Sequence, residues 1–221
     1  MDQNTKKQRV AEAVLDYIDN GESLGIGSGS TVNILIGNLS KVKSKIRNIV
    51  SSSVKSTELL EANGFEVSEL RDVGRLTKYI DGADEVNKNL QMIKGGGGAL
   101  TREKILAHNS NQFICIVDDS KKVDMLGQFP LPIEVIPLSR SSVSLELIKH
   151  GGRPVLRENF VSDNGNLILD IHNLQIMEPI KLEQTINNIP GVVTNGIFAL
   201  DHADVLLCAS DSGVDKTDLN A

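Results

Sequence analysis

The sequence is poor in aromatic side chains and lacks the features that mark a nucleic-acid or membrane protein. It has no Trp, aromatic residues make up 3%, and the formal net charge is −6. Nucleic acids bind to basic residues and, when single-stranded, to aromatic side chains that stack on bases, so we expect no nucleic-acid partner. No apolar run approaches the roughly 20 residues of a membrane span, and the N-terminus lacks the apolar core of a signal peptide. We therefore expect no membrane association.

Cysteine is also scarce. Cys115 and Cys208 are the only two, and each lies in an apolar run without a second thiol nearby in sequence. This pattern favours buried thiols in a reducing cytoplasm over a disulfide or a metal-binding pair. The histidines are scattered and we assign none of them a catalytic role; they are His108, His150, His172 and His202.

An alternation of short apolar runs and amphipathic segments predicts an α/β fold. Helices are expected at residues 6–18 and 55–62, and strands at 23–26 and 48–50. The continuous apolar run 112–117 is typical of a strand buried on both faces. This order of elements favours a doubly wound, mostly parallel sheet.

The pattern changes at Phe129-Pro130-Leu131-Pro132. The residues beyond it have the pattern of a small α+β (ferredoxin-like) module, with a hairpin predicted over 160–169 and Asn164-Gly165 at its tip. The apolar run 205–208 is expected to return to the first domain, which makes the module an insertion. The polar tail after Ser210 is expected to fray.

The 221 residues are thus enough for one large or two small domains. We expect an α/β catalytic domain formed by residues 1–128 and 204–221. An inserted α+β domain is expected at 129–203.

A Gly/Ser-rich loop follows the first predicted strand and leads into a helix. It reads Gly27-Ser28-Gly29-Ser30-Thr31, and N–H groups at the start of a helix can hold an anion. It is not a Walker P-loop, because no Gly-Lys-Ser/Thr closes it, and serine at position 30 fits the dinucleotide fingerprint poorly. An ordinary serine-capped turn is the alternative. The hydroxyl cluster favours a single phosphate.

The chain is organised around the segment DGADEVNKNLQMIKGGGGALTRE, which begins at Asp81 and ends at Glu103. Asp81 follows an apolar run and is expected at the carboxyl end of a strand, with Asp84 on the turn after it. Lys94 precedes the glycines 95–98, whose missing Cβ atoms let backbone amides approach a ligand. Glu103 is expected near the first turn of the next helix. Ligands bind at this edge of open α/β sheets.

These residues together suggest proton transfer on a small phosphorylated substrate. A carboxylate can move a proton between adjacent carbons, and a lysine ammonium can stabilise the enediolate formed between them. This chemistry requires no redox cofactor, and we expect neither a cofactor nor a metal. Taken singly, each residue has a plainer interpretation. The aspartates could cap turns or, with Glu85, bind a divalent cation; Glu103 could be a favourable helix charge, and the lysines could be ordinary surface residues.

Several longer motifs resemble ribose-5-phosphate isomerases of type A. They are DGADE, KGGGGALTREK, VDDSKKVDMLG and PLPIEVIP, and the resemblance runs from about Lys7 to about Asp211. It implies the interconversion of D-ribose 5-phosphate and D-ribulose 5-phosphate, a step of the non-oxidative pentose phosphate pathway. It also implies the inserted small domain, a cytoplasmic enzyme and a homodimer.

With this resemblance, we hypothesise a role for each candidate residue. Glu103 is the base that carries the proton between C1 and C2, and Lys94 stabilises the enediolate oxygen. Asp81 and Asp84 hold the sugar hydroxyls, and one of them assists opening of the furanose ring. The expected substrate-binding residues are Ser28, Gly29, Ser30, Thr31, Asp81, Gly82, Ala83, Asp84, Lys94, Gly95, Gly96, Gly97 and Lys121.

Other classes of protein stay open from the sequence. A sugar-phosphate-sensing module would bind the ligand without turnover, although a sensor has no need of a base. An amino-sugar phosphate isomerase or a CoA transferase accounts less well for DGADE and KGGGGALTREK. Turnover of ribose 5-phosphate would separate an enzyme from a sensor.

Overall fold

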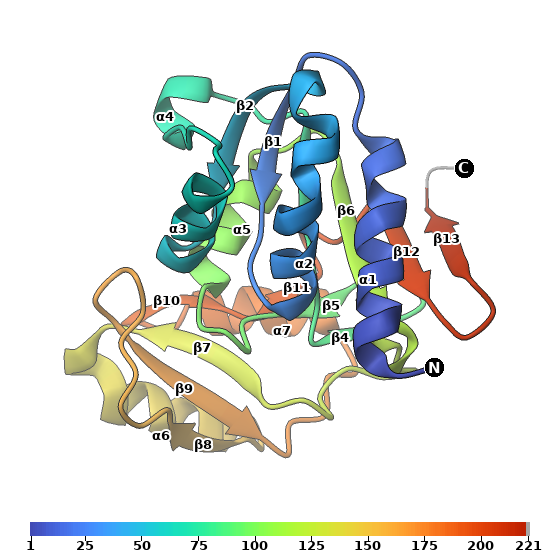
Figure 1. The fold of residues 1–221 in the computed structure, drawn as a ribbon. Helices are drawn as coiled ribbons and strands as arrows, with labels where there is room; N and C mark the ends of the chain where they lie inside the picture. Colours follow the sequence, from blue (N-terminus) through green and yellow to red (C-terminus); the bar gives the residue numbers. More distant parts are fainter. Residues whose placement is uncertain (220–221) are drawn as a thin grey trace. The chain divides into compact units, whose positions relative to one another are not determined.

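The computed structural model describes residues 1–219, and the chain divides into two compact units. Unit 1 comprises Met1–Ala83, Arg102–Lys121 and the residues from Ala203 onward. Unit 2 comprises Asp84–Thr101 and Lys122–His202. The chain therefore leaves unit 1 twice and returns to it twice, as the colour sequence in Figure 1 shows.

Unit 1 is built on a six-stranded sheet with the order β13-β12-β6-β3-β1-β2. All its neighbouring strands pair in parallel except β12 and β13, which are antiparallel. The sheet confirms the predicted α/β class with a mostly parallel sheet. Its strands are β1 (Glu22–Ile26), β2 (Ile46–Ser51), β3 (Lys78–Asp81), β6 (Phe113–Asp118), β12 (Val205–Ala209) and β13 (Val214–Asp218). Its helices are α1 (Gln3–Ala13), η1 (Val14–Tyr17), α2 (Ser30–Asn38), η2 (Leu39–Lys45), α3 (Val54–Ala62), α4 (Leu70–Val73) and η3 (Asp119–Lys121).

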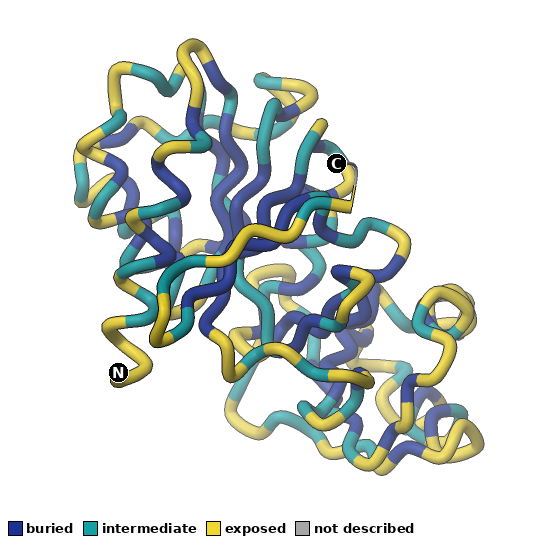
Figure 2. Tube along the Cα trace, turned by 90° about the vertical axis from the view of Figure 1, so that its right-hand side faces the viewer, coloured by how far each residue is buried: buried dark blue, intermediate teal, exposed yellow. Residues whose placement is uncertain are grey.

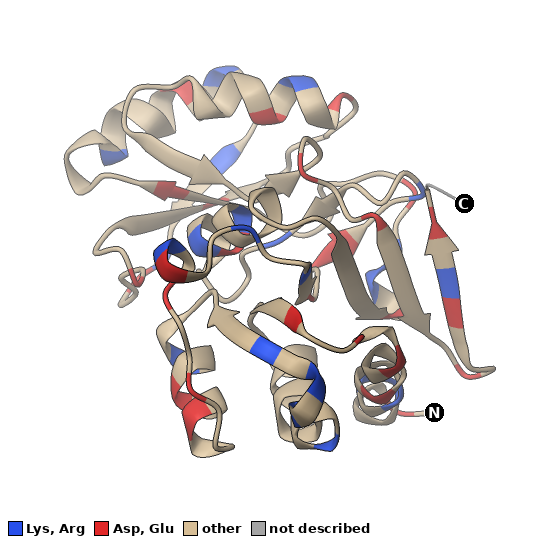
Figure 3. Cartoon of the chain, turned by 90° about the horizontal axis from the view of Figure 1, so that it is seen from above, with Lys and Arg blue, Asp and Glu red and all other residues tan. Residues whose placement is uncertain are grey.

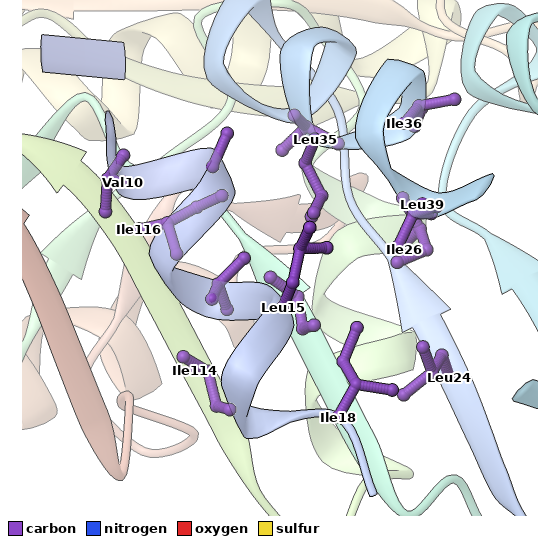
Figure 4. Packing of buried hydrophobic residues seen from close by; sticks show 14 of the residues in the cluster. Val10, Leu15, Ile18, Leu24, Ile26, Leu35, Ile36, Leu39, Ile114 and Ile116 are labelled. Carbon is purple, nitrogen blue, oxygen red and sulfur yellow. The ribbon is translucent and has the colours of Figure 1, made fainter. Parts of the chain in front are cut away.

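One face of this sheet is covered by α1 and α2, which lie side by side over the strands (Figure 1). Alternate strand residues point into this layer because successive side chains of a strand face opposite sides. Leu24 and Ile26 of β1 therefore pack in one cluster with the helices (Figure 4). Ile80 of β3 belongs to the same cluster. Further members of the cluster are Val10, Leu15, Ile18, Leu35, Ile36, Leu39, Ile114 and Ile116.

Helix α5 (Leu100–His108) packs on the opposite face of the sheet, and its residues from Arg102 onward belong to unit 1. A Cβ atom on Gly25 of β1 would lie 3.6 Å from Leu106 of α5 and 3.0 Å from Tyr79 of β3. Glycine at this position leaves room for the tyrosine ring, which is fully buried and contacts Phe113 with ring centroids 4.8 Å apart. Tyr79 and Asp81, two residues apart on β3, therefore share the face that α5 covers.

The polar tail is ordered, so the expectation that it frays is wrong for Val214–Asp218. This segment pairs antiparallel with β12 as the edge strand β13. Its burial pattern is mostly exposed, and a charged edge strand with one satisfied side discourages further pairing. The last two residues of the predicted tail lie outside the described residues.

Unit 2 contains a four-stranded sheet with the order β10-β7-β9-β8, in which all pairs are antiparallel. Along the chain the order is β7-α6-β8-β9-α7-β10, which is the ferredoxin-like arrangement and confirms the predicted α+β class. The elements are β7 (Leu131–Val135), η4 (Pro137–Ser139), α6 (Arg140–Lys149), β8 (Arg153–Leu156), β9 (Leu167–His172), α7 (Pro179–Asn187) and β10 (Val192–Asn195).

The hairpin predicted over 160–169 has a different first strand. The strand that precedes β9 and pairs with it is β8, and residues 157–166 form a long loop between the two. Asn164-Gly165 does make a tight turn, in which Gly165 N donates to Ser162 O at 2.9 Å. The turn residues were recognisable in the sequence, but the register of the strands was not.

A small three-stranded sheet completes unit 2. It has the order β11-β5-β4, with β4 (Glu85–Val86), β5 (Met92–Ile93) and β11 (Ile197–Phe198). These pairings group Asp84–Thr101 with Lys122–His202. Figure 2 shows buried strands in dark blue and exposed turns in yellow, and Figure 3 shows Lys and Arg interspersed with Asp and Glu along the elements. None of the described helices has the length and apolar character needed to cross a membrane.

Candidate active site

Asp81 lies at the carboxyl end of β3, where the sequence places it, and is fully buried. Its Oδ1 atom accepts hydrogen bonds from the backbone N–H groups of Ser28 at 3.0 Å and Gly82 at 2.7 Å. Its Oδ2 atom accepts a hydrogen bond from the hydroxyl of Tyr79. Buried carboxylates need such donors, and here they come from the loop after β1, from the turn after β3 and from the strand itself.

The neighbouring strand explains why a buried carboxylate fits at this point. Ile26 of β1 pairs with Ile80 of β3, so Gly27 lies directly beside Asp81. A Cβ atom on Gly27 would lie 1.9 Å from Cγ of Asp81, which no side chain could tolerate. Glycine at position 27 is therefore required by the carboxylate, apart from any role in binding a ligand.

Glu103 projects from the first turn of α5 and is 3% exposed. Its Oε1 atom accepts a hydrogen bond of 2.6 Å from Oγ of Ser28. Ser28 therefore joins both carboxylates, through its backbone N–H to Asp81 and through its hydroxyl to Glu103. The structure brings together four of the predicted site residues in unit 1, namely Ser28, Asp81, Gly82 and Glu103.

Tyr79 is a member of this cluster that the sequence interpretation missed. Burial raises the pKa of its phenol well above the ordinary value, and the negative charges of Asp81 and Glu103 add to the rise. The phenol therefore stays protonated and acts as a hydrogen-bond donor to Asp81. Its spacing two residues before Asp81 on a predicted strand was a signal that could have identified it, because such residues share a face.

The loop between β1 and α2 is not a serine-capped turn. The N-cap residue of α2 is Gly29, with φ of 99°, and the helix has no side-chain cap hydrogen bond. The Ser28 hydroxyl donates a hydrogen bond to Glu103, and Oγ of Ser30 accepts a hydrogen bond of 3.0 Å from Nζ of Lys7. A helix start without a side-chain cap and with an ammonium group beside it is suited to an anion. Lys7, on α1, was missed because no local pattern links it to the loop.

Two further predicted residues lie on unit 1 close to these groups in the chain. Thr31 lies in the first turn of α2, and Ala83 follows Gly82 at the end of the unit. Lys121 ends η3, just beyond the carboxyl end of β6 and thus on the same edge of the parallel sheet as Asp81. Within residues 1–219, no hydrogen bond joins Lys121 to the Asp81 and Glu103 cluster.

Unit 2 holds the second aspartate of the motif. Asp84 is partly exposed, and its Oδ2 atom accepts a hydrogen bond of 2.8 Å from the backbone N–H of Gly96. A Cβ atom on Gly96 would lie 2.7 Å from Oδ1 of Asp84. The glycine-rich loop therefore holds this carboxylate by close approach of its backbone. Gly95 has φ of 102° and Gly98 has φ of 84°, values that L side chains rarely adopt.

Lys94 immediately precedes this loop and is 3% exposed. Its backbone N–H donates to Gly196 O at 2.9 Å, which anchors it beside the small sheet of unit 2. Its ammonium group lies 5.4 Å from the centroid of the Phe198 ring, a favourable position for a cation. Gly97, the remaining predicted loop residue, is exposed.

No group of three or more His, Cys, Asp and Glu side chains arranged to hold a metal ion occurs in residues 1–219. Glu85, considered with the aspartates as a cation ligand, is 3% exposed and has a different task. Its carboxylate accepts hydrogen bonds from the backbone N–H groups of Gly127, at 2.8 Å, and Phe129. It therefore organises the chain that leads into β7.

Comparison with known proteins places the chain in one family. Residues 48–213 match the family described as ribose 5-phosphate isomerase A (phosphoriboisomerase A). The solved structure of ribose 5-phosphate isomerase A from Neisseria gonorrhoeae is 47% identical, with a TM-score of 0.96 over 98% of this chain and 97% of that one.

Two further solved structures agree. Ribose 5-phosphate isomerase A from Methanocaldococcus jannaschii is 35% identical, with a TM-score of 0.91 over 97% of this chain and 98% of that one. A D-ribose-5-phosphate isomerase in complex with phospho-erythronic acid is 36% identical, with a TM-score of 0.94 over 99% of this chain and 100% of that one. The chain therefore belongs to the ribose 5-phosphate isomerase A family.

Proposed function

We propose that this chain interconverts D-ribose 5-phosphate and D-ribulose 5-phosphate through an enediolate, with Glu103 as the base that moves the proton between C1 and C2. The activity is that of its family, an aldose–ketose isomerisation of the non-oxidative pentose phosphate pathway. The observation that supports this role for Glu103 is the hydrogen bond that its carboxylate accepts from the Ser28 hydroxyl. This hydrogen bond fixes the Glu103 carboxylate relative to the loop that is proposed to bind the phosphate. The distance from the phosphate to the base is then constant, as proton transfer at a particular carbon of the substrate requires.

The phosphate is proposed to bind at the start of α2. Backbone and hydroxyl groups of Ser28, Gly29, Ser30 and Thr31 surround it, and the absence of a side-chain cap leaves the helix start suited to an anion. The Lys7 ammonium at Ser30 supplies a positive charge, and Lys121 adds a contact from η3.

Lys94 is proposed to stabilise the oxygen of the enediolate, since a buried ammonium interacts strongly with a developing negative charge. Gly95, Gly96 and Gly97 are proposed to contact the substrate through their backbone, and Gly82 and Ala83 are proposed as further substrate contacts. A related structure holds phospho-erythronic acid, a phosphorylated sugar acid whose carboxylate resembles an enediolate in its two oxygens. That ligand supports an enediolate route.

Of the two aspartates, we assign the ring-opening role to Asp84. Asp81 is fully buried and accepts three hydrogen bonds within unit 1, whereas Asp84 is partly exposed and accepts one from Gly96. Asp81 is proposed to act on the sugar chiefly by holding the Ser28 loop and the Gly82 turn in place.

Turnover of ribose 5-phosphate by the purified chain tests the activity. We expect conversion to ribulose 5-phosphate in the presence of a chelator, and incorporation of solvent deuterium at the carbon that receives the proton. Binding of the sugar phosphate without conversion would identify a sensor instead. Complete retention of a C2 deuterium label, with none gained from solvent, would contradict an exchanging carboxylate base.

We also propose a homodimer in the cytoplasm. Leu145 and Ile148 on α6 are 63% and 55% exposed, and Leu138 in η4 is 96% exposed, which supports an apolar contact through unit 2. The buried thiols Cys115 and Cys208 suit a reducing compartment. Sedimentation of the wild type and of Leu145→Asp tests the dimer. A dimer unchanged by the substitution would move the interface elsewhere.

A further inference from the structure

An arginine that has no role in the proposed mechanism donates hydrogen bonds to the glycine-rich loop of unit 2. Nη1 of Arg157 donates to the carbonyl oxygens of Gly95 at 3.3 Å and Gly96 at 3.2 Å, and Nη2 donates to Gly95 O at 3.4 Å. Arg157 follows β8, in the loop that connects β8 and β9. The side chain is 18% exposed, so these contacts are largely shielded from water.

Two residues fix the guanidinium group in this position. Asp170 of β9 accepts hydrogen bonds from Nε at 2.9 Å and Nη2 at 2.5 Å, the bidentate arrangement that a planar fork allows. The Phe160 ring lies 5.3 Å from the guanidinium carbon. The same ring blocks the space beside Gly98, where a Cβ atom would lie 2.2 Å from Cζ of Phe160. We name Arg157, Asp170 and Phe160 the loop clamp.

The orientation of the two peptide groups follows from the clamp. In a trans peptide the C=O and the following N–H point in opposite directions, and the described chain has no cis bond. When the carbonyl of Gly95 points at Arg157, the N–H of Gly96 must point away from it, and this N–H donates to Asp84 at 2.8 Å. By the same rule, the carbonyl of Gly96 directs the N–H of Gly97 away from Arg157.

We propose that Arg157 is a positioning residue for the isomerisation, and that it acts by orienting the Gly95–Gly96 and Gly96–Gly97 peptides so that their N–H groups serve Asp84 and the substrate. This inference rests on the proposed function of the loop. A lysine could not replace the arginine fully, because one ammonium group cannot hold both carbonyls and the carboxylate with the same geometry. Glycine alone does not define the loop, because its backbone adopts many conformations at similar energy.

The test compares Arg157→Met with Arg153→Met, a matched control on β8 whose arginine is exposed. We expect Arg157→Met to lower kcat/KM roughly 10–100-fold, as misplacement of reacting groups does, and Arg153→Met to leave it within about twofold. Arg157→Lys should fall between the wild type and Arg157→Met. Hydrogen exchange of the peptide covering the glycines should accelerate in Arg157→Met and not in the control.

A double-mutant cycle separates positioning from general loss of stability. If Arg157 acts in part through the Gly96 N–H on Asp84, then Arg157→Met should lower kcat/KM by a clearly smaller factor in an Asp84→Asn background than in the wild type, and the remaining decrease measures the part that acts through the Gly97 N–H. Full additivity in that background, unchanged exchange of the loop, or near-normal turnover of Arg157→Met would overturn the proposal. Absence of turnover in the wild-type protein would instead contradict the proposed function. Hydrogen exchange of the glycine-rich loop needs no turnover, and it would then still test whether Arg157 orders that loop.

Discussion

The two aspartates of the DGAD motif are close in sequence and differ in their surroundings. Each carboxylate lies against a glycine that has no Cβ to obstruct it, Asp81 against Gly27 and Asp84 against Gly96. Asp81 is fully buried and accepts hydrogen bonds from two backbone N–H groups and one phenol. Asp84 is partly exposed and accepts one backbone hydrogen bond at 2.8 Å. One motif therefore provides a structural carboxylate and a more accessible one.

The difference shows how two aspartates of one motif can have different roles. A carboxylate has about four sites for accepting hydrogen bonds, and Asp81 has three occupied by groups that connect separate elements of unit 1. Removing its charge would therefore disturb the Ser28 loop and, through it, Glu103. Asp84 retains capacity to accept a hydroxyl of a sugar. The following predictions test this division, from the largest expected effect to the smallest.

Glu103→Gln should produce the largest change, a decrease in kcat of roughly 10²–10⁴-fold with little change in KM. The amide keeps the shape of the side chain but cannot take up the proton, and Asp81 cannot replace it because its oxygens are occupied. Steady-state kinetics measures the effect. Glu61→Gln, an exposed glutamate on α3, is the matched control. Near-normal turnover by Glu103→Gln would remove this residue from the mechanism.

Gly27→Ala should destabilise unit 1 far more than Gly96→Ala destabilises unit 2. The new Cβ would lie 1.9 Å from the buried carboxyl carbon of Asp81, whereas at Gly96 it meets the end of the partly exposed Asp84 at 2.7 Å. Overpacking a buried site costs about 1–3 kcal/mol or more, and we expect less than about 1 kcal/mol at Gly96. Urea unfolding measures both free energies. Equal losses would show that the two aspartates are held alike.

Asp81→Asn and Asp84→Asn should separate stability from activity. Asparagine at position 81 sets an NH2 group against one of the existing donors, so we expect a loss of about 1–3 kcal/mol in the free energy of unfolding. Asparagine at position 84 should leave stability nearly unchanged and lower kcat with the cyclic form of the substrate. Unfolding curves and kinetics on both variants decide the question. A stable Asp81→Asn with lost turnover would transfer the ring-opening role to Asp81.

The smallest effect concerns Tyr79 at high pH. Its pKa is raised well above the ordinary value of about 10 in the folded protein, so the phenol loses its proton earlier in the unfolded chain. The unfolded state then binds fewer protons. The contribution to stability is therefore complete below about pH 10 and decreases as pH rises toward the folded-state pKa.

Tyr79→Phe should remove this dependence. The wild type should exceed the variant by roughly 1 kcal/mol near pH 8, the value of one hydrogen bond, and the difference should shrink near pH 10.5. Urea unfolding at the two pH values measures it, with Tyr17→Phe as the control for the other tyrosine of the chain. A difference that stays constant with pH would mean that Tyr79 does not hold Asp81 as described.

Local patterns in the sequence were sufficient for the classes of structure and for the residues at strand ends. The apolar run before Asp81 predicted its position at the carboxyl end of β3, and the run at 112–117 predicted β6, whose residues are all buried. These predictions succeeded because burial imposes a periodicity that short segments display by themselves. The motifs DGADE, KGGGGALTREK, VDDSKKVDMLG and PLPIEVIP also sufficed for the family, which the comparisons confirm.

Only the tertiary structure decided which groups meet. The register of β1 against β3 brings Gly27 beside Asp81, and no property of either residue alone predicts that contact. The same holds for the Lys7 ammonium at Ser30, for the pairing of β8 with β9, and for the ordered edge strand β13. The contacts of Gly27 with Asp81 and of Lys7 with Ser30 join residues far apart in the chain, and the two strand pairings depend on a register that local composition does not define. Local composition therefore predicted the elements of this protein, and packing between them determined the environment of its two aspartates.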